Sequence, residues 1–169
     1  MSGPFVHLTL NHVPIVGVFF VLALLADAWR RRSGELANTS FAALVVLALV
    51  GIGVYFSGEA AEEAIEHLAG ISEERIEAHE QAGLFAFIGL ELLGAAGLAA
   101  LLWRRRIGTL RRWIGGVALL AAVVAGILTW TAYRGGLIRH PELHDADAPV
   151  EHEAGAHGDR GDRGGQGQP

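Results

Sequence analysis

Histidine and glutamate side chains gather beside the apolar stretches of this 169-residue sequence, and both are common ligands of metal ions. Imidazole with carboxylate suits zinc, iron, copper or manganese, whereas two opposed imidazoles suit the iron of haem b. The sequence has neither cysteine nor lysine, which excludes disulfides, thiolate metal sites, iron–sulfur clusters and Schiff-base chemistry. The candidate metal ligands are His12, Glu59, Glu62, Glu63, His79 and His140. For haem, the candidates are His12, His79 and His140, with Arg134 and Arg139 as partners of the propionates.

Four apolar stretches must position these residues, at about 13–29, 41–56, 82–103 and 113–133. Crossing the ~30 Å hydrocarbon core of a bilayer takes about 20 apolar residues in a helix. Inside a bilayer every backbone polar group must also be bonded within the protein. The stretches are apolar all round and lack the polar stripe of a soluble helical bundle, which is the alternative interpretation. The sequence therefore predicts an all-α fold, a four-transmembrane-helix bundle formed by residues 1–142.

Arginine is distributed unequally between the connections. Residues 30–40 and 104–112 carry eight arginines against one acid, whereas the opposite side carries five arginines against fifteen acids. Since positive charge marks the cytoplasmic side, we expect a multi-pass protein of the bacterial inner (cytoplasmic) membrane with both termini on the outer, periplasmic side. A cleaved signal peptide is disfavoured because Arg30–Arg32 follow the first apolar run instead of preceding it. On this orientation, all eight histidines fall on the outer side or at outer helix ends.

The outer connection, residues 57–80, is acidic and is predicted to be helical. Ser57 is the expected N-cap of a short helix that stops at Gly70. Ser72 is expected to cap a second helix, which continues through His79 directly into the third span. The tail, residues 143–169, is rich in Gly, Asp and His and has little to bury, so we expect it to be disordered.

Two acids lie inside the apolar stretches. Glu91 lies about nine residues into the third span, roughly 14 Å deep, where a carboxyl group must face the bundle, be neutral or have a partner. It is either a proton-holding group below the outer site, on the helix face of Glu80, or a protonated side chain hydrogen-bonded to a neighbouring helix. Its possible partners are Tyr55, Thr129 and Thr131. Asp27 is predicted to form an ion pair with Arg30 and Arg31.

Four motifs, NHxPIxG, GExAEExxEH, HExxG and GGxIRHPE, follow one another between about residue 7 and residue 142. In these motifs the sequence resembles an uncharacterised family of bacterial four-helix integral membrane proteins. That family is similar in layout to predicted membrane proteins grouped with b-type cytochromes and ferric reductases. The resemblance implies a haem or metal site at the matched positions. They are His12, Pro14, Gly58, Glu59, Glu62, Glu63, His79, Glu80, Gly136, Arg139, His140 and Glu142.

A transmembrane electron pathway of the b-cytochrome type uses two haems, with histidine ligands near each face. No histidine lies near the predicted inner face of this protein. At most one haem with two histidine ligands therefore fits, on the outer side. A redox role then requires a partner, such as another membrane redox subunit.

Three functions stay open, and none of them settles whether the protein is an enzyme. The first is a redox or metal-handling protein that uses the outer His/Glu site. The second is a non-catalytic accessory subunit, in which the acidic outer connection docks a basic partner and small residues allow packing on other helices or self-association. The third is a small cation or proton transporter that uses Glu91. The lipid bilayer is an expected partner in all three, and no nucleic acid is expected.

Overall fold

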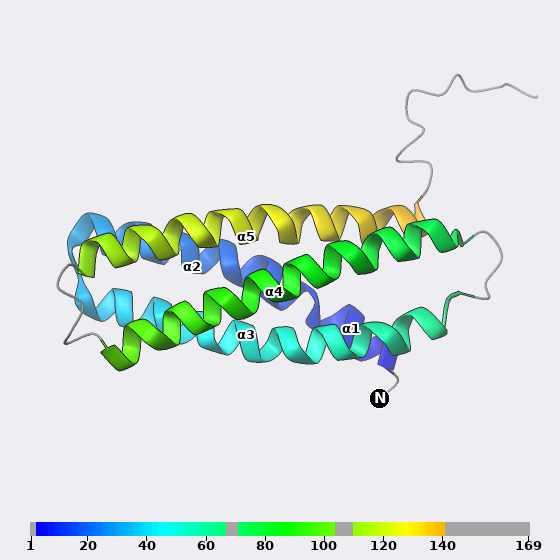
Figure 1. The fold of residues 1–169 in the computed structure, drawn as a ribbon, viewed down its shortest axis with the longest axis horizontal. Helices are drawn as coiled ribbons and strands as arrows, with labels where there is room; N and C mark the ends of the chain where they lie inside the picture. The colour runs from blue at the N-terminus through cyan, green and yellow to red at the C-terminus, as the bar shows by residue number, and fades with distance from the viewer. Residues whose placement is uncertain (1–2, 67–70, 104–109, 141–169) are drawn as a thin grey trace, which may run out of the picture.

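The computed structural model describes residues 3–66, 71–103 and 110–140, which are helical almost throughout (Figure 1). Its helices are α1 (Gly3–Leu10), α2 (His12–Arg31), α3 (Gly34–Glu63), α4 (Glu73–Trp103) and α5 (Leu110–Arg139). Within these ranges, four helical runs are long and apolar enough to cross a membrane, and α1 with α2 forms one of them. The predicted all-α fold with four candidate spans is therefore confirmed, and the chain has the architecture of a multi-pass membrane protein.

The long helices run side by side along the molecule (Figure 1), and their contacts form a ring in which each helix packs on two neighbours. α3 packs on α2 and α4, and α5 closes the ring by packing on α4 and α2. α1 precedes α2 with a bend at Asn11 and packs mainly on α3. Pro14 lies in the first turn of α2, where a missing backbone N–H is tolerated. The largest fully buried side chains are Phe41, Leu25, Leu44, Leu90 and Leu93.

The outer surface of the ring is apolar, as the interior is. Phe20, Leu49 and Leu119 point outward with 66%, 64% and 69% of their surface exposed. Contiguous exposed apolar surface of this kind is rare on soluble monomers. These outward side chains favour contact with the lipid bilayer over the alternative of a soluble bundle.

The helices are longer than the hydrocarbon layer that they are suited to cross. α3, α4 and α5 contain 30, 31 and 30 residues, about 45 Å each at 1.5 Å per residue, against a core of ~30 Å. Part of the excess lies at the start of α4, which begins nine residues before its apolar stretch 82–103. We call the end with this excess the histidine end; it carries His7, His12, His79 and His140. The opposite end, with Arg30–Arg32, Arg111 and Arg112, is the arginine end.

Glycines bring α3 and α4 into contact through their backbones. A Cβ atom built on Gly97 would lie 2.8 Å from the carbonyl oxygen of Phe41 and 3.3 Å from Cβ of Leu44. Gly94, one turn earlier on α4, faces the same strip of α3 at Ala48. Small residues are the usual means of close helix approach in membranes, where van der Waals packing must hold helices together.

At the arginine end, α2 and α3 are joined by a tight turn. Arg32 adopts the left-handed conformation, with φ 55°, and its N–H donates to the carbonyl of Ala28. Ser33 then caps α3, since its Oγ accepts from the N–H of Leu36 at 3.2 Å. One turn earlier, Asp27 forms the two ion pairs that the sequence predicts. They join Asp27 to Arg30 at 2.8 Å and to Arg31 at 2.7 Å.

The predicted N-cap at Ser57 is wrong. α3 continues through Ser57 and Gly58 to Glu63, because the Ser57 hydroxyl donates to the carbonyl of Val54 (2.9 Å) and the helix is not interrupted. The second predicted helix is confirmed: α4 begins directly after Ser72 and runs unbroken into the third span. Gly70, His67, Glu142 and the predicted disordered tail, residues 143–169, lie outside the described residues.

Candidate functional site

His12, His79 and His140 all lie at the histidine end, but the structure does not bring them together. His12 is exposed at the start of α2, and its Nδ1 lies 3.2 Å from the carbonyl of Leu8, on the preceding turn. His140 is exposed directly after α5, where its backbone N–H donates to the carbonyl of Gly136. In residues 3–66, 71–103 and 110–140, no group of three or more His, Asp or Glu side chains is placed to hold a metal ion.

His79 is the candidate residue that faces into the bundle. Its half-buried ring reaches from α4 to α5, where Nδ1–H donates to the carbonyl of Thr131 at 3.1 Å. The ring lies against Gly135, since a Cβ built there would be 2.9 Å from Cε1 of His79. Because the partner of Nδ1 is a carbonyl, a neutral ring carries its proton on Nδ1. Its Nε2 is then a lone-pair donor.

His7 makes a matching arrangement between α1 and α3. Its half-buried ring reaches from α1 to α3, where Nδ1–H donates to the carbonyl of Val54 at 3.0 Å. The Ser57 hydroxyl lies 3.4 Å from the same nitrogen. The ring lies over Gly58, since a Cβ built there would be 3.5 Å from Cε1 of His7.

Sequence reasoning counted His7 among the outer histidines but did not select it as a ligand. The reason is that it began the first helix near His12, whereas helical structure begins at Gly3. The sequence feature that indicates the earlier start is the run from Gly3 to Leu10, which contains no Asp, Glu, Lys or Arg. Such a run allows the helix to begin about two turns before His12. That earlier start places His7 opposite Gly58 on α3.

His7 and His79 form a symmetrical pair. Each is tied through Nδ1 to a backbone carbonyl on a neighbouring helix, and each packs on a glycine. Within the described residues, neither Nε2 has a hydrogen-bond partner. Histidines that ligate metals are usually held in this way, with the second ring nitrogen fixed by a carbonyl or a carboxylate.

A pair of carboxyl groups lies beside His79. Glu62 of α3 hydrogen-bonds Glu80 of α4, which holds the pKa of Glu62 at about 7, against an ordinary value of 4.5. Partial burial and the nearby charge of Glu66 act in the same direction. Glu62 lies six residues beyond the apolar stretch 41–56, outside the hydrocarbon layer. Glu59 and Glu63, the other predicted metal ligands of α3, are exposed.

We expect the Glu62–Glu80 pair to make stability depend on pH. The folded chain binds the shared proton more tightly than the unfolded chain, so the pair stabilises the fold at acid pH. That contribution is lost as pH rises from 4.5 through about 7. After solvent screening, its size is about 1 kcal/mol. The measurement is the thermal unfolding midpoint in detergent across this pH range.

Matched variants isolate the pair. Glu62→Gln should flatten the pH dependence, because an amide donates to Glu80 at every pH. Glu74→Gln, which removes an exposed acid from the first turn of α4, should leave it unchanged. A pH profile that is the same in the Glu62→Gln variant and in the unmodified protein would contradict the assignment.

The predicted propionate partners differ in their surroundings. The guanidinium of Arg134 is half-buried and lies over the ring of Trp130, 5.2 Å from its centroid. Arg139 is exposed at the end of α5. A third arginine, Arg75, donates from Nη1 to the carbonyl of Leu137 at 3.3 Å and so ties the start of α4 to the end of α5.

Glu91 has none of the partners expected for it. Its Oε1 is buried without a hydrogen-bond partner and lies 3.7 Å from a Cβ built on Gly51 of α3. Thr131 donates to the carbonyls of Ala82 and Ile127, and the hydroxyl of Thr129 is likewise bonded within α5. The third candidate, Tyr55, stacks on a phenylalanine ring of α4.

Comparison with known proteins adds no assignment. No family model matches the chain, and no curated protein or solved structure is significantly similar to it. The features of the chain that bear on function are therefore the geometry of the histidine end and the buried carboxyl group of Glu91.

Proposed function

We propose that this protein is a membrane-bound one-electron carrier that holds a single haem b between His7 and His79. The observation that carries the proposal is the pair of bonds from Nδ1 of each ring to a backbone carbonyl, on Val54 and on Thr131. These bonds direct a lone pair on each Nε2 away from the supporting helix. Two opposed imidazoles are a familiar axial ligand set for haem iron.

The surrounding residues suit this use of the two rings. A carbonyl that accepts from Nδ1–H fixes the orientation of the imidazole and raises the basicity of Nε2. Gly58 and Gly135 carry no side chain, which lets the rings of His7 and His79 pack directly on the backbones of α3 and α5. Arg134 and Arg139 are the proposed partners of the propionates. Haem, when bound, supplies reversible one-electron chemistry.

The same proposal requires a redox partner at the histidine end. The sequence has no histidine between His12 and His67 or between His79 and His140, which leaves the arginine end without an imidazole. One haem at the histidine end cannot pass electrons through the bilayer alone. By the distribution of arginine, we place the histidine end on the periplasmic side of a bacterial inner membrane. There the protein exchanges electrons with a neighbouring subunit or a second copy.

The test is an absorption spectrum with iron analysis of protein that is purified in detergent and supplied with haemin. We expect a Soret band and about one haem per chain, the stoichiometry that one histidine pair allows. The paired α and β bands of a reduced six-coordinate haem should appear on addition of dithionite. A preparation that is folded and helical but stays colourless after haemin would reject the proposal.

A second candidate function, a small proton or cation transporter, is favoured by two buried oxygens. Oε1 of Glu91 and Oδ1 of Asn11 are the buried side-chain oxygens without a hydrogen-bond partner in the described residues. Both are near α3, because Glu91 approaches Gly51 and the neighbour of Asn11, Leu10, approaches Gly53. Unpaired polar atoms in a bilayer are costly and are typical of ion or proton pathways.

Replacing Glu91 with glutamine tests this second function. If Glu91 carries protons, Glu91→Gln should lower proton uptake into liposomes by about tenfold or more, because the amide cannot release a proton. Folding should be unaffected, since the amide has the same shape. Glu73→Gln, at an exposed position in the first turn of α4, is the control. Equal uptake by Glu91→Gln and unmodified protein would exclude the transporter.

A further inference from the structure

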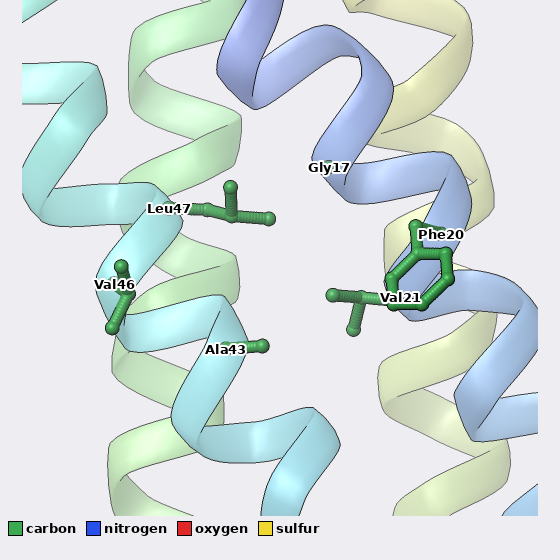
Figure 2. A pocket seen from close by; sticks show the side chains of 6 residues that line it. All are labelled: Gly17, Phe20, Val21, Ala43, Val46 and Leu47. Atoms are coloured by element: carbon green, nitrogen blue, oxygen red, sulfur yellow. The ribbon is translucent and has the colours of Figure 1, made fainter.

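An apolar groove of about 330 Å³ opens between α2 and α3 on the outer surface of the bundle. Figure 2 shows side chains from the two helices facing each other across it, with Phe20 and Val21 on one side and Ala43 and Leu47 on the other. Gly17 and Val46 complete the lining, so the groove presents no polar side chain. Its shape and chemistry suit a hydrocarbon chain.

The same two helices carry a positively charged turn at the arginine end. Asp27 offers one negative charge to both Arg30 and Arg31. Arg32 is exposed at the turn and has no ion pair within the described residues. Arg111 of α5 adds a fourth positive charge, with its guanidinium 3.9 Å from the ring centroid of Trp29. Even when the exposed acid Glu35 is counted, positive charge remains in excess.

Helix geometry places the turn about one leaflet from the groove along both helices, and on α2 it places Arg31 and Phe20 on nearly the same face. Arg31 follows Phe20 by eleven residues, which is about 16 Å along α2 and a rotation of only about 20°. On α3, Ala43 follows the cap Ser33 by ten residues, or about 15 Å. One leaflet of the hydrocarbon core is also about 15 Å thick. Along both helices, the distance from a phosphate at the turn to the groove therefore matches the length of one acyl chain.

We propose that α2 and α3 bind an anionic phospholipid, with its phosphate at Arg31 and Arg32 and the end of one acyl chain in the groove beside Phe20 and Ala43. The excess positive charge selects an anionic headgroup over a zwitterionic one. The apolar lining and the 15 Å spacing select a phospholipid over free phosphate. This inference is independent of the proposed haem.

The experiment is native mass spectrometry of the full chain in detergent, with phosphatidylglycerol and phosphatidylcholine of equal chain length in competition. Phosphatidylglycerol should be retained about tenfold better. The double variant Arg31→Gln, Arg32→Gln should lose this preference, whereas Arg112→Gln, an exposed arginine at the same end on α5, should keep it. Equal retention of the two lipids, or no effect of the double variant, would overturn the proposal.

A groove-filling variant tests the acyl-chain contact separately. Ala43→Phe should lower retention of phosphatidylglycerol about fivefold by occupying the space between the helices. Ala122→Phe, on the exposed face of α5, is the matched control. Loss of a dimer in Ala43→Phe, with lipid retention unchanged, would show that a second copy fills the groove and would overturn the lipid assignment. Free phosphate that competes as well as the lipid would do so too.

Discussion

Leucine in place of Gly97 should leave little folded protein in detergent. A Cβ at this position would lie 2.8 Å from the carbonyl oxygen of Phe41, and a whole isobutyl group has no room beside Leu44. The obstructing atom belongs to helix backbone, which cannot rotate away as a side chain can. α4 must therefore move off α3, with a cost of about 3 kcal/mol or more. Loss of helicity on heating, or in a titration with sodium dodecyl sulfate, measures the effect.

The same substitution on α5 provides the control. A Cβ built on Gly126 meets nothing within 4 Å, and the residue is exposed on the lipid-facing side. Gly126→Leu makes the same chemical change within another span, so it should unfold close to the unmodified protein. Equal stability of the Gly97→Leu and Gly126→Leu variants would show that backbone contact between α3 and α4 does not hold the bundle together.

Haem binding should depend on His7 and His79 and not on His12. Each alanine variant of the pair removes one axial ligand and the carbonyl bond that orients it, so each should lower haem affinity by at least about tenfold. His12→Ala should retain the full Soret band. In the unmodified protein the His12 ring is exposed, and its Nδ1 lies beside the carbonyl of Leu8, one turn earlier in the chain. The measurement is a haemin titration followed by absorption.

Two further readouts separate ligand loss from unfolding. Circular dichroism should show unchanged helix content in His7→Ala and His79→Ala, and added imidazole should restore the six-coordinate spectrum. If His12→Ala lost haem while His7→Ala kept it, the ligand set expected from the sequence would be the better one. Loss of haem without rescue in all three variants would indicate a merely structural role for the rings.

The fold was largely predictable because a bilayer leaves a chain few choices. Uncharged stretches such as 41–56 and 113–133 predict spanning helices by length alone. The ends of the helices were less predictable, because they depend on which backbone groups the polar side chains bond to. Ser57 is a common N-cap residue, yet in α3 its hydroxyl bonds to Val54 and the helix runs on.

The ligands expected from the sequence and the histidine pair proposed from the structure lie at the same end of the molecule, but the pair includes His7, which the sequence does not single out. Charge distribution and the positions of the histidines along the chain indicate depth, whereas the face of a helix depends on where that helix begins. His7 and His12 differ by five residues, so a start at Gly3 places His7 against α3 and leaves His12 exposed. His79 belongs to both sets, because its helix continues without a break from Ser72 into the third span.

The excess length at the start of α4 has an electrical consequence. The nine residues of α4 that precede its apolar stretch include His79, and Val54, which holds His7, lies two residues from the end of the apolar stretch 41–56, so the proposed haem lies at the edge of the hydrocarbon. An electron that arrives and departs there crosses almost none of the membrane potential, which would otherwise contribute about 2.3 kcal/mol per charge for each 100 mV. Turnover at this site would neither charge the membrane nor respond to its voltage, and a water-soluble electron carrier could reach it without entering lipid.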